Sequence, residues 1–317
     1  MSRILLTAIG SMAAAPAARR YQALGHTVFG CDIYPREWTA LAGELEFFQA
    51  RLATEGEPYV EQLKEAVRRN GLDFLIPLTD PEVDALAPRK AEFRTLGCTV
   101  CVPEERVAAL CRRKDTTNRF LAEKQVCRLI PTEIAVSGQT CPFPFPAMVK
   151  PRSGRSSLGQ AVAADEKSYQ TALAGREDCI VQPFLEGDIF CVDVARDAFG
   201  HTRATARQEL LRNKSGLGMT VEVLPGHPLE AVCAAIAEAV GLVGVVNMEF
   251  IRHGDDFFFL EVNPRFSGGV GFSMAAGMDF AEMMLCCHSG GSVEAFPAAP
   301  KHALLARESA IVLTQLR

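Results

Sequence analysis

Two glutamates and an asparagine in the last quarter of the chain have the types and spacing of ligands for a hard metal cation. Glu249 lies in the segment NMEF, Glu261 lies in FLEV, and Asn263 follows two residues later. The polar turn HGDD at 253–256 separates two apolar runs, which predicts an antiparallel hairpin with the three side chains on one face. Two carboxylates and an amide suit Mg²⁺, with Mn²⁺ as an alternative, and leave positions for phosphate oxygens.

The same glutamates could instead lie on a solvated strand face, which is common for an isolated pair. The apolar residues around Glu261, at 257–262, favour a buried strand and therefore a functional pair. Arg265 follows closely and could stabilise charge on a transferring phosphoryl group or on an acyl phosphate. The segment SGG at 267–269 predicts an amide-rich loop for an anion or a substrate carboxylate, although a plain turn has the same residues.

A second group of candidates lies about a hundred residues upstream, in MVKPRSGRSSLG. Lys150 stands at a predicted strand end and supplies a point charge for phosphate. The loop after it offers backbone amides from Gly154, Ser156, Ser157 and Gly159. This is not a phosphate-binding loop of the GxxxxGK[ST] type, because the lysine precedes the loop, and a glycine- and serine-rich loop is weak evidence by itself.

Two further segments complete the candidate nucleotide site. Lys114 begins a predicted helix 36 residues before Lys150 and, taken alone, would be an ordinary surface lysine. The segment VQPFLEGD at 181–188 predicts a strand that leads into a turn. Its Gln182 and Phe184 are expected beside a nucleotide base, and Asp188 could hold a ribose.

The elements that must position these residues fall into two patterns. Apolar strands at 4–8, 26–31 and 72–77 alternate with helices, including one over 58–70, so residues 1–108 predict a small, mostly parallel α/β domain. The first strand leads into AIGSMAAA, which lacks the glycines of a GxGxxG turn, so a nicotinamide-dependent oxidoreductase is disfavoured. Beyond it, the sequence predicts helices over 107–125 and 228–240 and the hairpin strands 245–251 and 257–262.

Composition limits the partners that the chain could have. The 317 residues are 48% hydrophobic and carry a formal net charge of −5, which favours neither nucleic acid nor an anionic membrane as a partner. No apolar run reaches the length of a membrane span. The eleven cysteines are scattered, and the one CxxC, at Cys98 and Cys101, has no second pair, so we expect reduced thiols, a cytoplasmic protein and no zinc. A homodimer is the default oligomer.

Taken in order, these segments resemble the ATP-grasp superfamily, in the branch similar to the large subunits of carbamoyl-phosphate synthase. The resemblance covers roughly the last two-thirds of the chain, and residues 1–108 are similar to the Rossmann-like α/β domain that precedes such cores. It implies an ATP-grasp domain at 109–317, made of two α+β subdomains at 109–183 and 184–317. ATP would lie between them, with both lysines on the phosphates, the 154–159 loop as a mobile lid, and Glu249, Glu261 and Asn263 on the metal.

The resemblance also implies the chemistry. Such enzymes convert a carboxylate into an acyl phosphate, release ADP and let an amine attack, which predicts a carboxylate–amine ligase with an amino acid as one substrate. It would place Arg207 and Arg212, in RQELLRNKSG, near the phosphates or the acyl phosphate, with Lys150, Arg212 and Arg265 as the catalytic set. Pro183 and Asp188 depart from the acidic residue and the glutamate that are usual at their positions, so a ribose contact from Asp188 is in doubt.

Two questions stay open at this level. A catalytically silent ATP-binding regulatory module is the alternative to an enzyme, although the full set of candidate residues argues against it. The acceptor pocket has no motif; the segments 79–82, 267–272 and 274–284 are its candidates, and the methionines of the last one have the helical spacing of a core.

Overall fold

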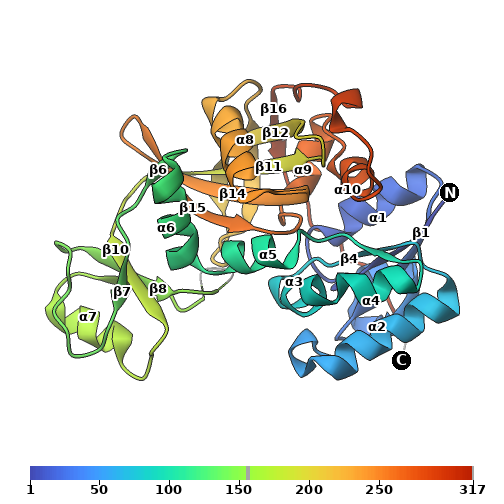
Figure 1. Ribbon diagram of the computed structural model, residues 1–317, viewed down its shortest axis with the longest axis horizontal. Coiled ribbons are helices and arrows are strands. Elements are labelled where there is room, and N and C mark those ends of the chain that lie inside the picture. Colours follow the sequence, from blue (N-terminus) through green and yellow to red (C-terminus); the bar gives the residue numbers. More distant parts are fainter. Residues whose placement is uncertain (155–157, 316–317) are drawn as a thin grey trace.

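The computed structural model describes residues 1–154 and 158–315, and Figure 1 shows three sheets with their helices. The N-terminal sheet is parallel and has the strand order β3-β2-β1-β4-β5, as the alternating pattern of the sequence predicts. Its strands are β1 (Arg3–Leu6), β2 (Thr27–Asp32), β3 (Glu46–Gln49), β4 (Phe74–Ile76) and β5 (Thr99–Val100), and its helices are α1 (Ala14–Ala23), α2 (Glu57–Asn70), α3 (Asp80–Leu86) and α4 (Lys90–Thr95). Short 3₁₀ turns occupy Arg36–Trp38, Ala40–Gly43, Ala53–Glu55 and Ala87–Arg89.

Local sequence signals set these boundaries. Helix α2 ends where Gly71 adopts a left-handed conformation with φ of 57°, which a glycine accepts without a steric penalty. Helix α3 begins with a capping box, in which the Glu82 carboxylate accepts hydrogen bonds from the backbone N–H and the hydroxyl of Thr79. This cap fixes the direction in which α3 leaves the end of β4.

A separate antiparallel sheet follows, at the left of Figure 1, with the order β7-β10-β8-β9. Its strands are β7 (Glu133–Ala135), β8 (Ala147–Pro151), β9 (Ala161–Ala163) and β10 (Cys179–Pro183), and helix α7 (Glu166–Leu173) packs on it. Asp165 caps α7 by accepting a hydrogen bond from the Ser168 N–H at 2.8 Å. The sheet has its own small core, which includes Val149, Tyr169 and Val181.

The third sheet has seven strands in the order β16-β13-β12-β11-β14-β15-β6, antiparallel except for the β15–β6 pair. Its strands are β6 (Arg128–Leu129), β11 (Asp188–Arg196), β12 (Thr202–Arg212), β13 (Gly218–Val223), β14 (Gly244–His253), β15 (Asp256–Asn263) and β16 (Ala303–Ala306). Helix α8 (Pro228–Val240) covers one face, α9 (Val270–Ala275) and α10 (Phe280–His288) follow β15, and a 3₁₀ turn spans Val293–Ala295. The predicted hairpin is confirmed as β14–β15, in which Glu249 pairs with Glu261 and Asn247 with Asn263.

The single helix predicted over 107–125 is wrong, because the chain forms two helices, α5 (Glu105–Arg112) and α6 (Lys114–Lys124). Arg113 between them is extended, with φ of −112° and ψ of 109°. The break frees the Lys114 N–H to donate to the Arg152 carbonyl at 2.9 Å, just beyond β8. The start of α6 is therefore bound to the end of the strand that carries Lys150.

The N-terminal sheet and the seven-stranded sheet share one hydrophobic core. The cluster contains Ile4 of β1 and Tyr21 of α1 on one side, and Ala195 of β11 and Met284 of α10 on the other. The Tyr21 hydroxyl also donates to the Ala281 carbonyl at 2.9 Å. In the described residues, no helix combines the length and the apolar character needed to span a membrane.

Candidate active site

A cavity of about 790 Å³ lies where the three sheets meet, and most of the candidate residues line it. Of the residues singled out in the sequence, Lys114, Lys150, Gly154, Gln182, Phe184, Arg207, Arg212, Glu249, Glu261, Asn263, Arg265 and Ser267–Gly269 line its wall. Ser156 and Ser157 lie outside the described residues. Gly159 has a left-handed φ of 72°, and its carbonyl accepts a hydrogen bond from Arg176 at 2.6 Å.

The two glutamates of the β14–β15 hairpin converge with Asn263, whose amide nitrogen lies 3.4 Å from one carboxylate oxygen of each. Burial, together with the negative charge of Glu261, raises the pKa of Glu249 to about 7. Glu261 behaves differently: burial opposes its ionisation, but Lys114 at 2.8 Å and Lys150 hold the pKa of Glu261 below its usual value. Two adjacent carboxylates repel each other when both are ionised, and a bound cation would relieve that repulsion.

The donor set fits a hard cation that a nucleotide helps to hold. In the described part of the chain, no three His, Cys, Asp or Glu side chains gather as a metal site. The hairpin offers two carboxylates and one amide, all oxygen ligands, so a cation of the Mg²⁺ type would need further oxygens from bound phosphate. The open cavity beside the hairpin has room for such a group.

Two lysines lie opposite the hairpin. Burial lowers the pKa of Lys150 to about 8, although Glu261 and Glu249 act against the shift. Lys114 reaches Glu261 from the start of α6. The Arg152 side chain binds Asp115, next to Lys114, at 2.5 Å, and this ion pair reinforces the backbone link between the two lysine-bearing segments.

The end of the cavity beyond Lys150 is largely apolar. Ile130, Met148, Ile251 and Leu260 line it together with Phe184, whose backbone N–H donates to the Pro146 carbonyl at 3.0 Å. The Gln182 side chain donates to the Thr132 hydroxyl at 2.7 Å, which fixes the β10 strand beside this pocket. An apolar slot next to a phosphate-sized polar region has the character of a nucleobase site.

The assignment of Asp188 to this site is wrong. Ile189 and Cys191 of β11 line the cavity, and strand alternation turns Asp188 and Phe190 to the opposite face, where Phe190 joins the core under α8. There Asp188 forms an ion pair with Arg252. The sequence contained this information, because the strand that begins at Asp188 fixes the alternation.

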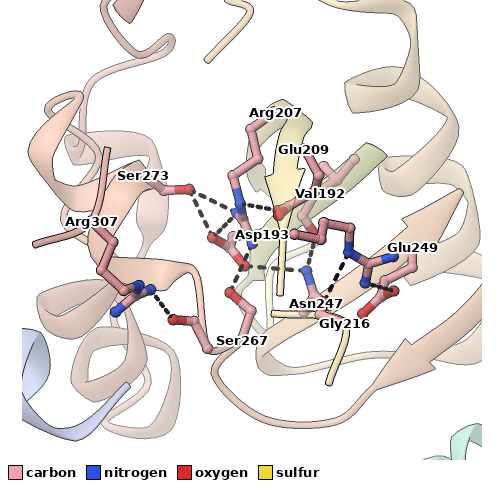
Figure 2. Close-up of polar contacts among 12 residues, drawn as sticks. Val192, Asp193, Arg207, Glu209, Gly216, Asn247, Glu249, Ser267, Ser273 and Arg307 are labelled. Carbon is pink, nitrogen blue, oxygen red and sulfur yellow. Dashed lines mark hydrogen bonds and ion pairs between the residues drawn. The ribbon is translucent and has the colours of Figure 1, made fainter. Parts of the chain in front are cut away.

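Arg207 and Arg212 both line the cavity, but they differ in their partners. Arg212 donates from Nε to the Gly216 carbonyl at 2.8 Å, and its Nη2 lies 3.8 Å from Glu249. Arg207 is almost fully buried, and each of its three nitrogens contacts a protein oxygen (Figure 2). The expected contact of Arg207 with the phosphates or the acyl phosphate stays a prediction, and four of the five N–H groups of this side chain are already bonded to Asp193, Glu209 and two serines.

Residues of the N-terminal domain form the remaining wall, and the sequence analysis missed part of them. The segment 10–13 follows β1, and the segment 78–80 follows β4. Arg265 reaches this wall and pairs with Asp80 through two contacts of 2.9 and 3.1 Å. From β1 the chain continues to β2 and β3 on one side, and then crosses to β4 and β5 on the other side of β1, so a switch point lies between β1 and β4. Open α/β sheets bind ligands at such a point, and this rule could have found segment 10–13.

Comparison with known proteins finds a family match for part of the chain and similar folds for nearly all of it. Residues 175–310 match the family model described as "ATP-grasp in the biosynthetic pathway with Ter operon". The biotin carboxylase of Campylobacter jejuni, solved with an ATP analogue, superposes with a TM-score of 0.75 at 16% identity, over 96% of this chain and 74% of that one. Residues 175–310 are therefore similar to an ATP-grasp family, and the chain as a whole shares its fold with this solved structure.

Further similar proteins have names that describe different reactions. The formate-dependent phosphoribosylglycinamide formyltransferase of Synechococcus sp. (strain CC9605) is 27% identical over 275 residues, which is 77% of this chain. The match spans 64% of the length of that relative. The L-amino acid ligase of Bacillus licheniformis superposes with a TM-score of 0.70 at 14% identity, over 92% of this chain and 74% of that one.

Proposed function

We propose that this ATP-grasp protein is an ADP-forming carboxylate–amine ligase that uses ATP and Mg²⁺ and takes an amino acid as one substrate. The observation that carries the proposal is one continuous cavity, which joins an apolar slot, two lysines, the Glu249–Glu261 hairpin and Arg265. We also propose that the chain divides near residue 108, because the parallel sheet ends with β5 and the following helices α5 and α6 contribute to the core of the seven-stranded sheet.

Different parts of the cavity suit the different parts of ATP. The slot beside Phe184 suits the base, and Lys114 and Lys150 suit the phosphates. Glu249, Glu261 and Asn263 would hold Mg²⁺, which would neutralise negative charge on the phosphates. Phosphoryl transfer needs such positioning and charge neutralisation more than a nucleophilic side chain, so the protein requires no nucleophile of its own.

The reaction follows from this placement. A substrate carboxylate oxygen attacks the terminal phosphorus and ADP leaves, which gives an acyl phosphate; the amine nitrogen then attacks the carbonyl carbon, phosphate leaves and the nitrogen loses its proton. Arg212 lies beside the Glu249 carboxylate and Arg265 beside the side-chain oxygen of Asn263, where both would stabilise negative charge on the acyl phosphate. Lys150 would hold the transferred phosphoryl group from the opposite side.

An amino acid fits the end of the cavity that the N-terminal domain forms. Asp80 and Arg265 present a carboxylate and a guanidinium side by side. A zwitterion carries both complementary charges, so its ammonium and carboxylate could be recognised by this pair. The structural similarity to an L-amino acid ligase supports the same choice.

The test is a coupled ADP-release screen in which carboxylates and amines are varied independently with Mg·ATP, followed by mass spectrometry of any product. We expect at least one amino-acid-containing pair to release ADP and form an amide. Glu261→Ala should abolish turnover and weaken Mg·ATP binding, whereas Glu238→Ala, which removes an exposed carboxylate from α8, should match the parent.

Two results would count against the proposal. If Mg·ATP bound tightly but no pair released ADP, the chain would be a silent ATP-binding module. If Glu261→Ala bound Mg·ATP as well as the parent, the hairpin would not be the metal site. We further propose a cytoplasmic protein, since all eleven cysteines are free thiols, and a homodimer, which size-exclusion chromatography would test.

A further inference from the structure

Arg207, in the middle of β12, is an unusual group for the wall of a ligand cavity because it is 1% exposed and each of its three nitrogens contacts a protein oxygen. Its Nη1 binds Asp193 at 2.5 Å and Ser273 at 3.1 Å, its Nη2 binds Ser267 at 3.0 Å, and its Nε lies 3.3 Å from Glu209. Figure 2 shows these side chains pointing at the guanidinium from four segments of the chain. Four of the five N–H groups of Arg207 are thus bonded to oxygens of described residues.

Burying this ion pair requires a reason beyond stability. Asp193 is 1% exposed, and it also accepts a hydrogen bond from the Ser273 hydroxyl at 2.7 Å. Removing two charges from water is costly, and apolar side chains of similar volume often stabilise a core as well as such a pair does. What apolar residues would not supply is a set of directed donors that hold neighbouring segments in one arrangement.

The segment that Arg207 holds is the 267–269 loop, which follows Arg265 and lines the cavity. Ser267 accepts a hydrogen bond from the guanidinium, and Gly269 lies directly against it. A Cβ at position 269 would come within 2.7 Å of Nη2 and 3.0 Å of Cζ, so only a glycine lets the loop pack this closely. The backbone of the 267–269 loop thus packs directly against the Arg207 guanidinium.

The same group of side chains extends to the metal hairpin. The second oxygen of Asp193 lies 3.4 Å from the amide nitrogen of Asn247, whose own oxygen lies 3.3 Å from the amide of Asn263. A continuous series of polar side-chain contacts therefore links Arg207 to Asn263, an expected metal ligand.

We propose that Arg207 is a positioning residue that, held by Asp193, sets the 267–269 loop against the substrate end of the cavity. It acts through the loop and does not touch the nucleotide. This inference rests on the proposed ligase function for its effect on turnover, but the effect on the loop itself does not depend on turnover. Lysine cannot replace Arg207, because a single ammonium cannot reach Asp193 and Ser267 in the same fixed geometry.

The test uses three variants that disturb the contact in different ways. Arg207→Lys keeps the positive charge but loses the planar guanidinium with its several N–H donors. Ser267→Ala removes one acceptor of the guanidinium, and Gly269→Ala pushes the loop away from it. The matched control is Arg203→Lys on the same strand, whose side chain donates to the Glu294 and Phe296 carbonyls away from the cavity. Each full-length protein is measured for Mg·ADP affinity, for hydrogen exchange of the peptide covering 266–272, and for kcat and KM with the pair found in the screen.

We expect all three variants to exchange the 266–272 peptide faster than the parent while their Mg·ADP affinity stays within about twofold. A misplacement of about 1 Å can cost on the order of a hundredfold in rate, so turnover should fall by about ten- to a hundredfold. Arg203→Lys should change none of these values.

Each contrary result is informative. A large loss of Mg·ADP affinity in Arg207→Lys would show direct contact with phosphate and overturn the proposal. So would unchanged exchange of the 266–272 peptide in Ser267→Ala and Gly269→Ala, two changes that remove no charge and keep the proposal testable if Arg207→Lys does not fold. If the parent itself is inactive with every pair, the ligase function fails, and the exchange data still decide the role of Arg207.

Discussion

Lys150 offers the sharpest test of where the nucleotide phosphates bind. The side chain is 5% exposed, and burial lowers its pKa from 10.5 to about 8. Because the folded pKa lies below the unfolded value, the charged lysine destabilises the fold by about 3 kcal/mol at pH 7. This cost is fully present below pH 8 and disappears as the pH rises through 10.5. A bound phosphate would compensate it.

If phosphate binds next to Lys150, the binding of ADP above pH 8 should be accompanied by uptake of a proton at Lys150. Phosphate oxygens next to Lys150 favour its charged form, so they should raise its pKa well above 8. At pH 7 the free protein already carries this proton, but at pH 9 about nine-tenths of the molecules must acquire one on binding. The affinity for ADP should therefore fall about fivefold between pH 8 and pH 9, and approach a tenfold loss per pH unit above that.

Isothermal titration calorimetry in buffers of different ionisation enthalpy measures this uptake directly. Glu249, whose pKa is raised to about 7, is already ionised above pH 8, so it does not obscure the signal. Lys150→Met should bind ADP more weakly and take up almost no proton at pH 9. If the parent took up no more protons at pH 9 than Lys150→Met does, Lys150 would not contact the phosphates.

Two further substitutions test the geometry. Asp80→Asn removes the charge that pairs with the Arg265 guanidinium, and breaking a buried pair costs about 3 kcal/mol, so thermal unfolding should begin several degrees lower. Asp84→Asn, at a more exposed pair with Arg112, should lower the unfolding temperature less. Equal shifts for both variants would show that the Asp80–Arg265 pair stabilises the fold no more than an exposed pair does. Asp188→Ala should leave ADP affinity within about twofold of the parent, because strand alternation turns this side chain away from the cavity, and a tenfold loss in a binding titration would restore its ribose role.

The nucleotide end of the cavity was predictable because its residues are fixed by local rules. Glu249 and Glu261 meet because one hairpin pairs them, and the spacing of polar turn and apolar strands determines the hairpin. Lys150 stands at the end of a strand that a short apolar run identifies. The prediction for Asp188 came from the family pattern and was wrong. Asp188 begins β11, and side chains alternate along a strand, so it lies on the opposite face from Ile189 and Cys191, which line the cavity.

The substrate end could not be predicted in the same way, because no local rule connects its parts. Arg265 and Asp80 are 185 residues apart in sequence, and Arg207 and Ser267 are 60 apart. The Asp80–Arg265 contact depends on the hydrophobic core that the N-terminal sheet and the seven-stranded sheet share, which fixes the distance between their loops. The Arg207–Ser267 contact depends instead on the strand order β12-β11-β14-β15 within the seven-stranded sheet. A change in that core would move Asp80 relative to Arg265 without altering the Glu249–Glu261 hairpin. Substrate choice in this protein should therefore respond to mutations in the shared core that leave nucleotide binding intact, which is a dependence that no motif in the sequence records.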